Sequence, residues 1–385
     1  MSRKLIVLTL ATVLVAGLVT AGATASGKQS TRRSFSVGIY DDGMTLGNPE
    51  KGFPILKNLR AQVVRITLWW GGPIGVARTK RPVTPTNPAD PAYNWAAYDR
   101  AVELAAKSKI KVLFSIVGTP SWANGRRSQR VAPTKPKDLQ NFATAAARRY
   151  SGAFKDADGN TLPAVRLWLA WNEPNNPVFL APQYKKVKGH YIALSAFNYA
   201  RICNAIYNGV HAVQHRAARV ACGGTDPRGN NQPRSRRASI SPIAFLRLVK
   251  KYHLRRFDAW AHHPYASRPS ETPTSTPKAK TVVILGNLGD LGKELTRLYG
   301  RSKPIWITEY GYQTRPPDRH FGVAWKTQAK YLAQAFAIAR KNPRVQMMIW
   351  FLVKDESRLA GWQSGFFTTR GKRKPAYFAF RALKH

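Results

Sequence analysis

The sequence is poor in acidic residues. Its 385 residues include 62 Lys and Arg but only 19 Asp and Glu, which gives a formal net charge of +43, and only seven residues are Glu. Such a surface attracts polyanions without a dedicated site, so we expect nonspecific association with anionic cell-wall polymers and no specific nucleic-acid partner. The alternative is that the charge only keeps the protein soluble. Each of the few carboxylates is therefore informative.

Cysteine is nearly absent, since Cys203 and Cys222 are the only two in the sequence. No spacing of Cys and His is typical of a zinc site, and we expect neither a metal nor a cofactor. In an exported protein the two cysteines are predicted to form a disulfide. The sequence leaves this prediction open, because separation along the chain does not give the distance between the Cα atoms.

No apolar run is long enough to predict a membrane span. The run over residues 5–19 follows Arg3 and Lys4 and precedes the small residues Ala23 and Ala25. A spanning helix needs roughly 20 apolar residues, whereas this pattern is typical of a secretory signal peptide. We expect a signal peptide at residues 1–25, a disordered basic segment at 26–33 and one domain at 34–385. The protein is then secreted, extracellular or cell-wall associated, with no membrane span after cleavage; a membrane anchor is the alternative.

Apolar runs alternate with helix-like stretches along the rest of the chain. The runs suited to strands are Phe35–Tyr40, Val63–Trp70, Val112–Val117, Val165–Trp171, Val220–Gly223, Phe257–Ala261, Ile305–Thr308 and Val345–Leu352. The helix-like stretches are Pro49–Arg60, Trp95–Ser108, Lys137–Tyr150, Tyr191–Gln214, Pro242–His253, Leu285–Tyr299, Trp325–Arg340 and Pro375–Leu383. Strands that alternate with helices predict a parallel sheet whose buried strands are almost continuously apolar.

Two α/β architectures fit this alternation. A doubly wound open sheet normally has a glycine-rich phosphate turn after its first strand. Residues 39–52 read IYDDGMTLGNPEKG and lack that fingerprint. The number of strand–helix pairs and the chain length match a (β/α)8 barrel. The predicted fold is therefore an α/β, single-domain (β/α)8 TIM barrel.

Two Glu residues stand at the ends of apolar runs. Glu173 follows the fourth run in WLAWNEPN, where Pro174 disfavours a helix, and Glu309 follows the seventh in PIWITEYGY. In a (β/α)8 barrel, the loops after the strands form the face that holds the active site. Two carboxyl groups in one cavity can hydrolyse an acetal, because one donates a proton while the other attacks the anomeric carbon or stabilises its charge. The alternative is that each is an ion-paired or capped strand end.

These motifs resemble those of clan A of the glycoside hydrolases, near families five and thirty-nine, from about Ser34 to the C-terminus. The resemblance implies that Glu173 is the general acid/base and Glu309 the nucleophile. It also implies retention of configuration, with the carboxyl groups about 5–5.5 Å apart. The third run ends SIVGTPSW, without the histidine common in family five, and no β-sandwich appendage like that of family thirty-nine is visible. The exact family and the sugar stay open.

The resemblance also implies a set of polar substrate-binding residues. Asn172, in the NEP motif, is expected to bond the sugar 2-hydroxyl, and Arg65 in VVRITLWW matches an arginine of the second strand. His263 and Tyr265 in HHPY match a His-x-Tyr pair, with Tyr265 expected to hold Glu309. His262 and His263 point opposite ways on a strand, and the match selects His263 for the cavity.

Tryptophan is abundant, with 11 residues. Sugars stack on aromatic rings, and Trp69, Trp70, Trp122, Trp350 and Trp362 lie at or beyond the predicted strand ends. The resemblance favours Trp350, in MMIWFL, as the platform beneath the sugar, and Trp122 is a further substrate-binding prediction. For Trp70 and Trp362, packing and ligand contact stay open. Three others are expected in the core: Trp168, Trp260 and Trp306.

The predicted function is a secreted, retaining glycosidase that cleaves β-linked glycans in oligo- or polysaccharides without a cofactor. A non-catalytic barrel that binds polyanions or cell-wall polymer, and a transglycosidase, are the alternatives. Basic loops such as VARTKRP, NGRRSQR and PRSRRAS lie on the catalytic rim and could bind an acidic glycan. The opposite rim is equally basic, so the sequence does not locate the charge at the site.

Overall fold

The computed structural model describes residues 35–300 and 303–384. The predicted signal peptide at residues 1–25 and the basic segment at 26–33 lie outside these residues. Among the helices of the described part, none has both the length and the apolar character that crossing a membrane requires.

Eight parallel strands close into a barrel, which confirms the predicted (β/α)8 fold. The barrel strands, in chain order, are β1 (Ser36–Tyr40), β2 (Val63–Trp69), β3 (Lys111–Val117), β4 (Leu167–Ala170), β7 (Arg219–Thr225), β8 (Ala259–His262), β9 (Ile305–Tyr310) and β12 (Val345–Phe351). The ring is closed by β1, which pairs with β2 on one side and β12 on the other.

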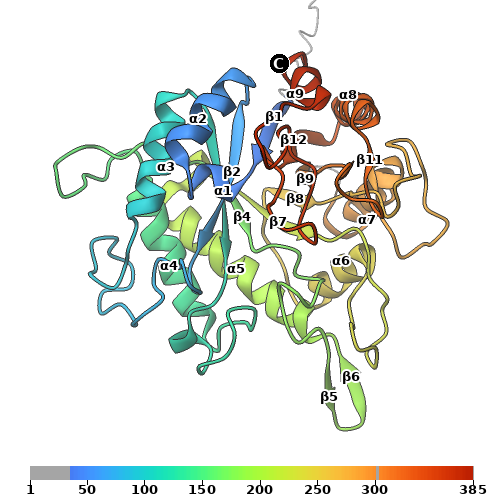
Figure 1. Cartoon of the computed structure of the whole chain (residues 1–385). Helices are drawn as coiled ribbons and strands as arrows, with labels where there is room; N and C mark the ends of the chain where they lie inside the picture. Colours follow the sequence, from blue (N-terminus) through green and yellow to red (C-terminus); the bar gives the residue numbers. More distant parts are fainter. Residues whose placement is uncertain (1–34, 301–302, 385) are drawn as a thin grey trace, which may run out of the picture. The chain divides into compact units, whose positions relative to one another are not determined.

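Helices connect the strands and surround them (Figure 1). The α-helices are α1 (Asp42–Thr45), α2 (Pro49–Asn58), α3 (Ala96–Lys107), α4 (Pro136–Arg149), α5 (Leu194–Gln214), α6 (Pro242–Lys251), α7 (Leu288–Tyr299), α8 (Trp325–Lys341) and α9 (Pro375–Arg381). Four of them, α2, α4, α6 and α9, begin with proline, whose fixed φ suits the first helical position. Lys or Arg in the last turns of α4, α6 and α8 complements the partial negative charge there.

The loops add small elements to the barrel. These are the hairpin of β5 (Lys185–Val187) and β6 (His190–Ile192), the pair β10 (Thr314–Arg315) and β11 (Val323–Ala324), and the 3-10 turns η1 (Ser121–Ala123), η2 (His215–Ala217) and η3 (Leu285–Asn287). The helix predicted from Tyr191 begins only at Leu194, because Tyr191 pairs with Lys186 in the hairpin.

Two apolar layers lie on either side of the strands. Side chains that alternate along each strand face opposite ways. The layer inside the barrel consists of Val63, Leu113, Leu169, Ala221, Ala259, Ala261, Trp306, Met347 and Ile349. Their neighbours along the strands, such as Val64, Met348 and Trp350, belong to the outer layer beneath the helices. This alternation places Arg65, two residues after Val63, inside the barrel.

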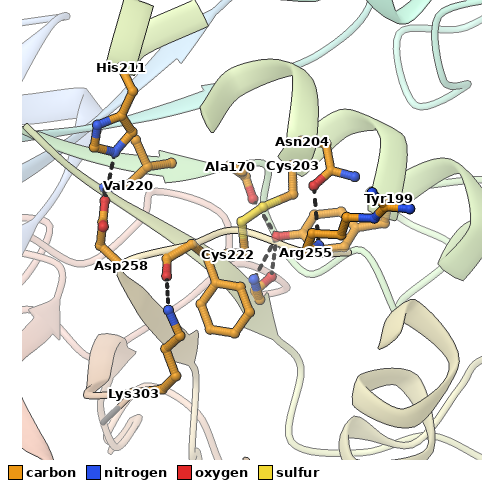
Figure 2. Close-up of a disulfide and its surroundings, with 12 residues drawn as sticks. Ala170, Tyr199, Cys203, Asn204, His211, Val220, Cys222, Arg255, Asp258 and Lys303 are labelled. Atoms are coloured by element: carbon orange, nitrogen blue, oxygen red, sulfur yellow. Dashed lines mark hydrogen bonds and ion pairs between the residues drawn. A yellow bond between two sulfur atoms is a disulfide. The ribbon is translucent and has the colours of Figure 1, made fainter. Parts of the chain in front are cut away.

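A disulfide joins the helix layer to the barrel. Cys203 of α5 and Cys222 of β7 are paired, with their Cα atoms 6.0 Å apart (Figure 2). On the same helix, the Tyr199 hydroxyl accepts a hydrogen bond from the Gly223 amide at 2.6 Å and donates to the Ala170 carbonyl at 2.9 Å. Helix α5 therefore holds the ends of two neighbouring strands, β4 and β7, close to where Glu173 follows.

Candidate active site

The two predicted catalytic carboxyl groups meet at the C-terminal end of the barrel. Glu173 follows β4 and Glu309 lies near the end of β9, and their residues are only 8% and 7% exposed. His263 lies with them, and one ligand atom from each of the three residues falls within 4.8 Å of the others. Residues that follow or end three different strands, and that are far apart in the sequence, thus form one buried group.

A reversal of the backbone aims Glu173 at this group. Trp171 has φ 67° and Glu173 has φ 36°, values that are costly for residues other than glycine. The strand ends at Ala170 because Trp171 cannot continue it. The Glu173 amide donates to the Gly224 carbonyl at 2.8 Å, which fixes the reversed segment against β7.

A β-bulge aims Glu309. Met348 of β12 pairs with Ile307 of β9, and Trp350 pairs with Tyr310, so β9 holds an extra residue between these pairs. Ile307 and Tyr310 both belong to the outer layer. A bulge of this kind changes the facing of a strand residue. Glu309 therefore points into the barrel mouth instead of toward the helices.

Arg65 connects the predicted residues. Its fully buried guanidinium donates from Nη1 to Glu309 Oε1 at 2.5 Å, from Nη2 to Asn172 Oδ1 at 2.6 Å and from Nε to Ser115 Oγ at 2.7 Å. The Tyr265 hydroxyl donates to the other oxygen of Glu309, Oε2, at 3.1 Å. Both oxygens of Glu309 are therefore held by donors, as expected for a carboxylate that stays ionised.

His263 binds the other carboxyl group. Its Nδ1 lies 3.0 Å from Glu173 Oε1, and its Nε2 lies 3.0 Å from Thr308 Oγ1. Burial, followed by the positive charge of Arg65, holds the pKa of His263 well below its usual value, so the imidazole is neutral. His262 faces away, with Nε2 2.9 Å from the Val283 carbonyl. The two histidines thus point in opposite directions, as the sequence predicts.

The two carboxyl groups have different electrostatic surroundings. Burial, followed by the charges of Asp226 and Glu309, raises the pKa of Glu173 well above its usual value. Burial also raises the pKa of Glu309, but the charge and hydrogen bond of Arg65 and the hydrogen bond of Tyr265 oppose it. The proton at neutral pH therefore belongs on Glu173. Separation of two carboxyl pKa values is what assigns acid and base roles in such pairs.

Asp226 belongs to the site, although the sequence reasoning did not select it. It follows β7, and its Oδ2 accepts from Asn176 Nδ2 at 2.9 Å. The same Nδ2 lies 3.4 Å from Glu173 Oε2, so one amide bridges the two carboxyl groups. The buried side chain of Asn175 holds this loop through the carbonyls of Asp226 and Ile240. An acidic residue just after the fifth barrel strand was the signal that could have identified Asp226.

Trp350 does not join the site. It is fully buried in the outer layer, its indole donates to the Ser364 carbonyl at 3.0 Å, and its ring stacks on Phe366. The predicted role of Trp350 beneath the sugar is therefore corrected to packing between β12 and the following loop.

Other aromatic residues occupy the rim. Trp122 is half-buried, donates to the Ala77 carbonyl at 2.7 Å and packs its ring against Trp70 and Arg81. Trp362, whose role the sequence left open, is half-buried with its ring centroid 4.9 Å from that of Tyr265 and 5.5 Å from that of Phe351. Because Tyr265 binds Glu309, the Trp362 ring lies against a residue that holds one of the two carboxyl groups.

Two cavities lie next to residues that contact the buried carboxyl groups or Arg65. The first, of about 760 Å³, is called here the arginine cavity, and its lining includes Arg228, Tyr265, Arg268, Arg319 and Trp362. The second, of about 700 Å³, is called the acidic cavity, and its lining includes Tyr40, Asp42, Phe351, Asp355 and Glu356. Tyr265 contacts Glu309, and Tyr40 lies under the Arg65 guanidinium at 4.4 Å from its ring centroid. One tyrosine thus links each cavity to the carboxyl pair.

The donor atoms of Glu173, His263 and Glu309 have a spacing that a metal ion could use. However, Arg65 already binds Glu309 Oε1, and its fixed positive charge opposes a second cation there. The arrangement suits carboxyl chemistry better than metal binding.

Comparisons with known proteins agree with this geometry. A family model described as "Glycosyl hydrolase catalytic core" matches residues 283–376, a stretch that contains Glu309. A search of the curated proteins found no match. The family match confirms the predicted resemblance to glycoside hydrolases over this stretch of the chain.

Several solved structures with the same fold are described as glycosidases. A family 39 glycoside hydrolase from Bacteroides cellulosilyticus WH2 has a TM-score of 0.59 at 18% identity over 91% of this chain, which spans 63% of that chain. A glucosidase from Croceicoccus marinus has a TM-score of 0.64 at 15% identity, over 91% of this chain and 67% of its own. The fungal β-1,4-galactanases have a TM-score of 0.57 at 13% identity, over 90% and 99%. At these identities the likeness shows the fold alone.

Proposed function

We propose that the protein is a retaining glycosidase that cleaves β-linked glycans by double displacement, with Glu309 as nucleophile and Glu173 as acid/base. The observation that carries this proposal is the approach of the two carboxyl groups, which have oxygens within 4.8 Å of each other. Retaining glycosidases place their carboxyl groups about 5–5.5 Å apart, whereas inverting enzymes leave about 6.5–9.5 Å for a water molecule.

In the first step, the ionised Glu309 attacks the anomeric carbon. The bond from that carbon to the glycosidic oxygen breaks, and its electron pair stays on the oxygen, which takes the proton of Glu173. Arg65 and Tyr265 hold the two Glu309 oxygens and so orient the attacking carboxylate. The products of this step are the free leaving group, an ester between the sugar and Glu309, and an ionised Glu173.

In the second step, Glu173 acts as a base. It takes a proton from a water molecule whose oxygen attacks the anomeric carbon, and the ester bond breaks to restore the Glu309 carboxylate. The negative charge of Glu309 is one cause of the raised pKa of Glu173. Because the ester removes that charge, the pKa of Glu173 falls when the residue must act as a base, and it rises again when the ester is cleaved.

Asn172 is suited to bind a sugar hydroxyl beside this reaction. Arg65 occupies its Oδ1 oxygen, which orients the side-chain amide. The Nδ2 group, the opposite end of that amide, can then donate to the substrate. This arrangement supports the expected contact with the sugar 2-hydroxyl, and Trp362 supplies an aromatic face for the ring.

We also propose that the protein is exported, with residues 1–25 removed. The charged start, the short apolar run and the small residues before position 26 support this proposal. The pairing of Cys203 with Cys222 also fits an oxidising compartment. Sequencing the N-terminus of protein recovered from the culture medium tests it, and an N-terminus at Ser26 is expected.

The catalytic proposal is tested with a panel of chromogenic aryl β-glycosides. We expect Glu309→Ala to lose turnover and to regain it with azide, which should yield the inverted glycosyl azide. In Glu173→Ala the rate should fall by about 10²–10⁴-fold for poor leaving groups and much less for leaving groups that need no proton. Glu294→Ala is the matched control, because Glu294 is 8% exposed but binds Arg247 and Arg297 on α6 and α7. Full turnover in Glu309→Ala without azide would contradict the proposal.

A further inference from the structure

Two residues that line the arginine cavity act on the proposed catalytic carboxyl groups. Tyr265 lines the cavity and donates its hydroxyl to Glu309. Arg228 also lines the cavity, and its positive charge acts on Glu173, whose raised pKa it partly opposes. A molecule in this cavity therefore lies against Tyr265, which binds Glu309, in a space of about 760 Å³ that suits one or more sugar residues.

The arginines of this cavity are not held by ion pairs within the described residues, although the positive charge of Arg228 acts on Asp226 and Glu173. Arg228, Arg268 and Arg319 are exposed, and in residues 35–300 and 303–384 none of them forms an ion pair with a carboxylate. Asp318 also lines the cavity, but its Oδ1 accepts from the backbone amides of His320 at 2.8 Å and Phe321 at 3.0 Å. The three guanidinium groups are therefore open to an anion.

The general excess of positive charge does not account for this lining. The acidic cavity on the other side of the group is lined by four carboxylates and two cations: Asp41, Asp42, Asp355, Glu356, Lys51 and Lys354. Two cavities of similar size thus differ in the sign of their lining, in a chain whose formal net charge is +43. The difference locates positive charge at one side of the catalytic group, which the sequence alone could not do.

We propose that the arginine cavity binds an anionic sugar residue of the substrate, a uronic acid whose carboxylate is bound by Arg228, Arg268 or Arg319. This inference rests on the proposed glycosidase function and names its substrate class. Arg forms forked hydrogen bonds to carboxylates, and Trp362 in the same lining offers a ring for the sugar face.

Such a substrate would also favour its own cleavage. Burial is the main cause of the raised pKa of Glu173, and the charges of Arg65 and Arg228 oppose it. A carboxylate bound at Arg228 neutralises one of these opposing charges. Glu173 then keeps its proton more firmly, which is the state that protonates the leaving oxygen.

The test compares each neutral aryl β-glycoside with the uronide of the same configuration, in the gluco, galacto and manno series. A third arm uses the 6-sulfate of the neutral glycoside, which carries an anion of different shape. We measure kcat/KM for the wild type and for Arg228→Gln/Arg268→Gln/Arg319→Gln. In at least one series the uronide should exceed the neutral glycoside by about tenfold, and the triple variant should remove about tenfold or more from the uronide only.

The matched control is Arg216→Gln/Arg255→Gln/Arg256→Gln. These three exposed arginines precede β7 and β8, at the opposite end of the barrel, and their substitution changes the net charge equally. The control should keep the uronide preference. An equal loss in both triple variants would overturn the inference, because it would show general attraction of anions.

Failure of this inference and failure of the glycosidase proposal give different results. Turnover of neutral glycosides above every uronide overturns the anionic subsite and leaves the glycosidase intact. Preference for the 6-sulfate over the uronide overturns the assignment to uronic acids. If no aryl glycoside is cleaved, the glycosidase proposal is in question. The anionic subsite is then tested by calorimetry of Glu309→Gln with a β-linked glucuronate tetrasaccharide. Binding that is abolished when the three cavity arginines are also replaced supports the subsite, and absence of binding overturns it.

Discussion

Replacing Arg65 by methionine removes the one fully buried cation that the structure places beside the catalytic carboxyl groups. Arg65 donates to Glu309 at 2.5 Å, to Asn172 at 2.6 Å and to Ser115 at 2.7 Å, and all these contacts are lost in Arg65→Met. Removing one partner of a buried ion pair costs about 3–5 kcal/mol, because the remaining charge is left without compensation. We expect a loss of that size in the free energy of unfolding at neutral pH.

The size of the loss depends on pH, with a definite sign. Burial raises the folded-state pKa of Glu309, and Arg65 is the main influence that opposes this rise. For a carboxyl group whose folded pKa is raised, the stability contribution is fully present below the unfolded pKa and is lost as the pH rises through the folded pKa. Arg65→Met raises the folded pKa further. The deficit is therefore smaller in acid, where Glu309 is protonated, and complete at neutral pH.

Urea unfolding of the wild type, Arg65→Met and Arg65→Met/Glu309→Gln at acid and neutral pH measures this effect. The double variant should recover part of the stability at neutral pH, because it removes the uncompensated charge. In active preparations, the acid limb of kcat/KM should move to higher pH in Arg65→Met. An equal deficit at both pH values, with no recovery in the double variant, would show that the role of Arg65 is packing and refute the reasoning.

Four further predictions concern this group and the residues that support it. Asp226→Asn removes a charge that raises the pKa of Glu173, so the alkaline limb of kcat/KM should move to lower pH. Reducing the Cys203–Cys222 disulfide, which closes a loop with a sequence separation of 19, should cost about 3 kcal/mol and lower Tm by about 4 °C in calorimetry. Trp362→Ala should lower kcat/KM by about tenfold or more. Trp350→Phe should instead lower stability by about 1–3 kcal/mol and leave KM unchanged, because it only frees the Ser364 carbonyl.

The barrel and its carboxyl pair could be predicted because both depend on local patterns. The run from Val112 to Val117 (VLFSIV) is apolar on both faces except for Ser115, which is typical of a buried parallel strand. Glu173 and Glu309 interrupt or follow such runs, and parallel barrel strands bring their C-terminal ends to one face. Residues at the C-terminal ends of barrel strands share one face however far apart they are in the sequence. The sequence therefore correctly predicted that Glu173 and Glu309 lie together.

The apolar character of both faces of the barrel strands also explains the error at Trp350. In a strand that alternates polar and apolar residues, the pattern shows which side chains face inward. In β12 the residues Met347, Met348, Ile349 and Trp350 are all apolar, so nothing in the sequence distinguishes the two faces. The bulge in β9 presents a similar difficulty, because a single extra residue there leaves no mark in an apolar run.

The lining of the arginine cavity could not be predicted for a different reason. Its three arginines come from loops after three different strands, β7, β8 and β9, and each loop resembles many other basic segments of this chain. Only the folded structure shows that these arginines share a cavity while four carboxylates share the other. In a protein with a net charge of +43, basic residues are expected in most surface segments, so a basic segment says little about function. The charge of the residues that line one cavity is more informative.

The charges of the buried group support the proposed catalytic roles without reference to any relative. Two buried carboxyl groups share one fully buried cation, Arg65, and the imidazole of His263 is neutral. Ionisation of both carboxyl groups would leave a net negative charge in a water-poor site that already has Asp226 nearby, which is costly. One proton must therefore stay in the group. Glu309 has Arg65 and the Tyr265 hydroxyl to stabilise its charge, while Glu173 has only uncharged donors within hydrogen-bond distance, so the proton resides on Glu173. The residue that keeps the proton is the one that can donate it to the leaving oxygen.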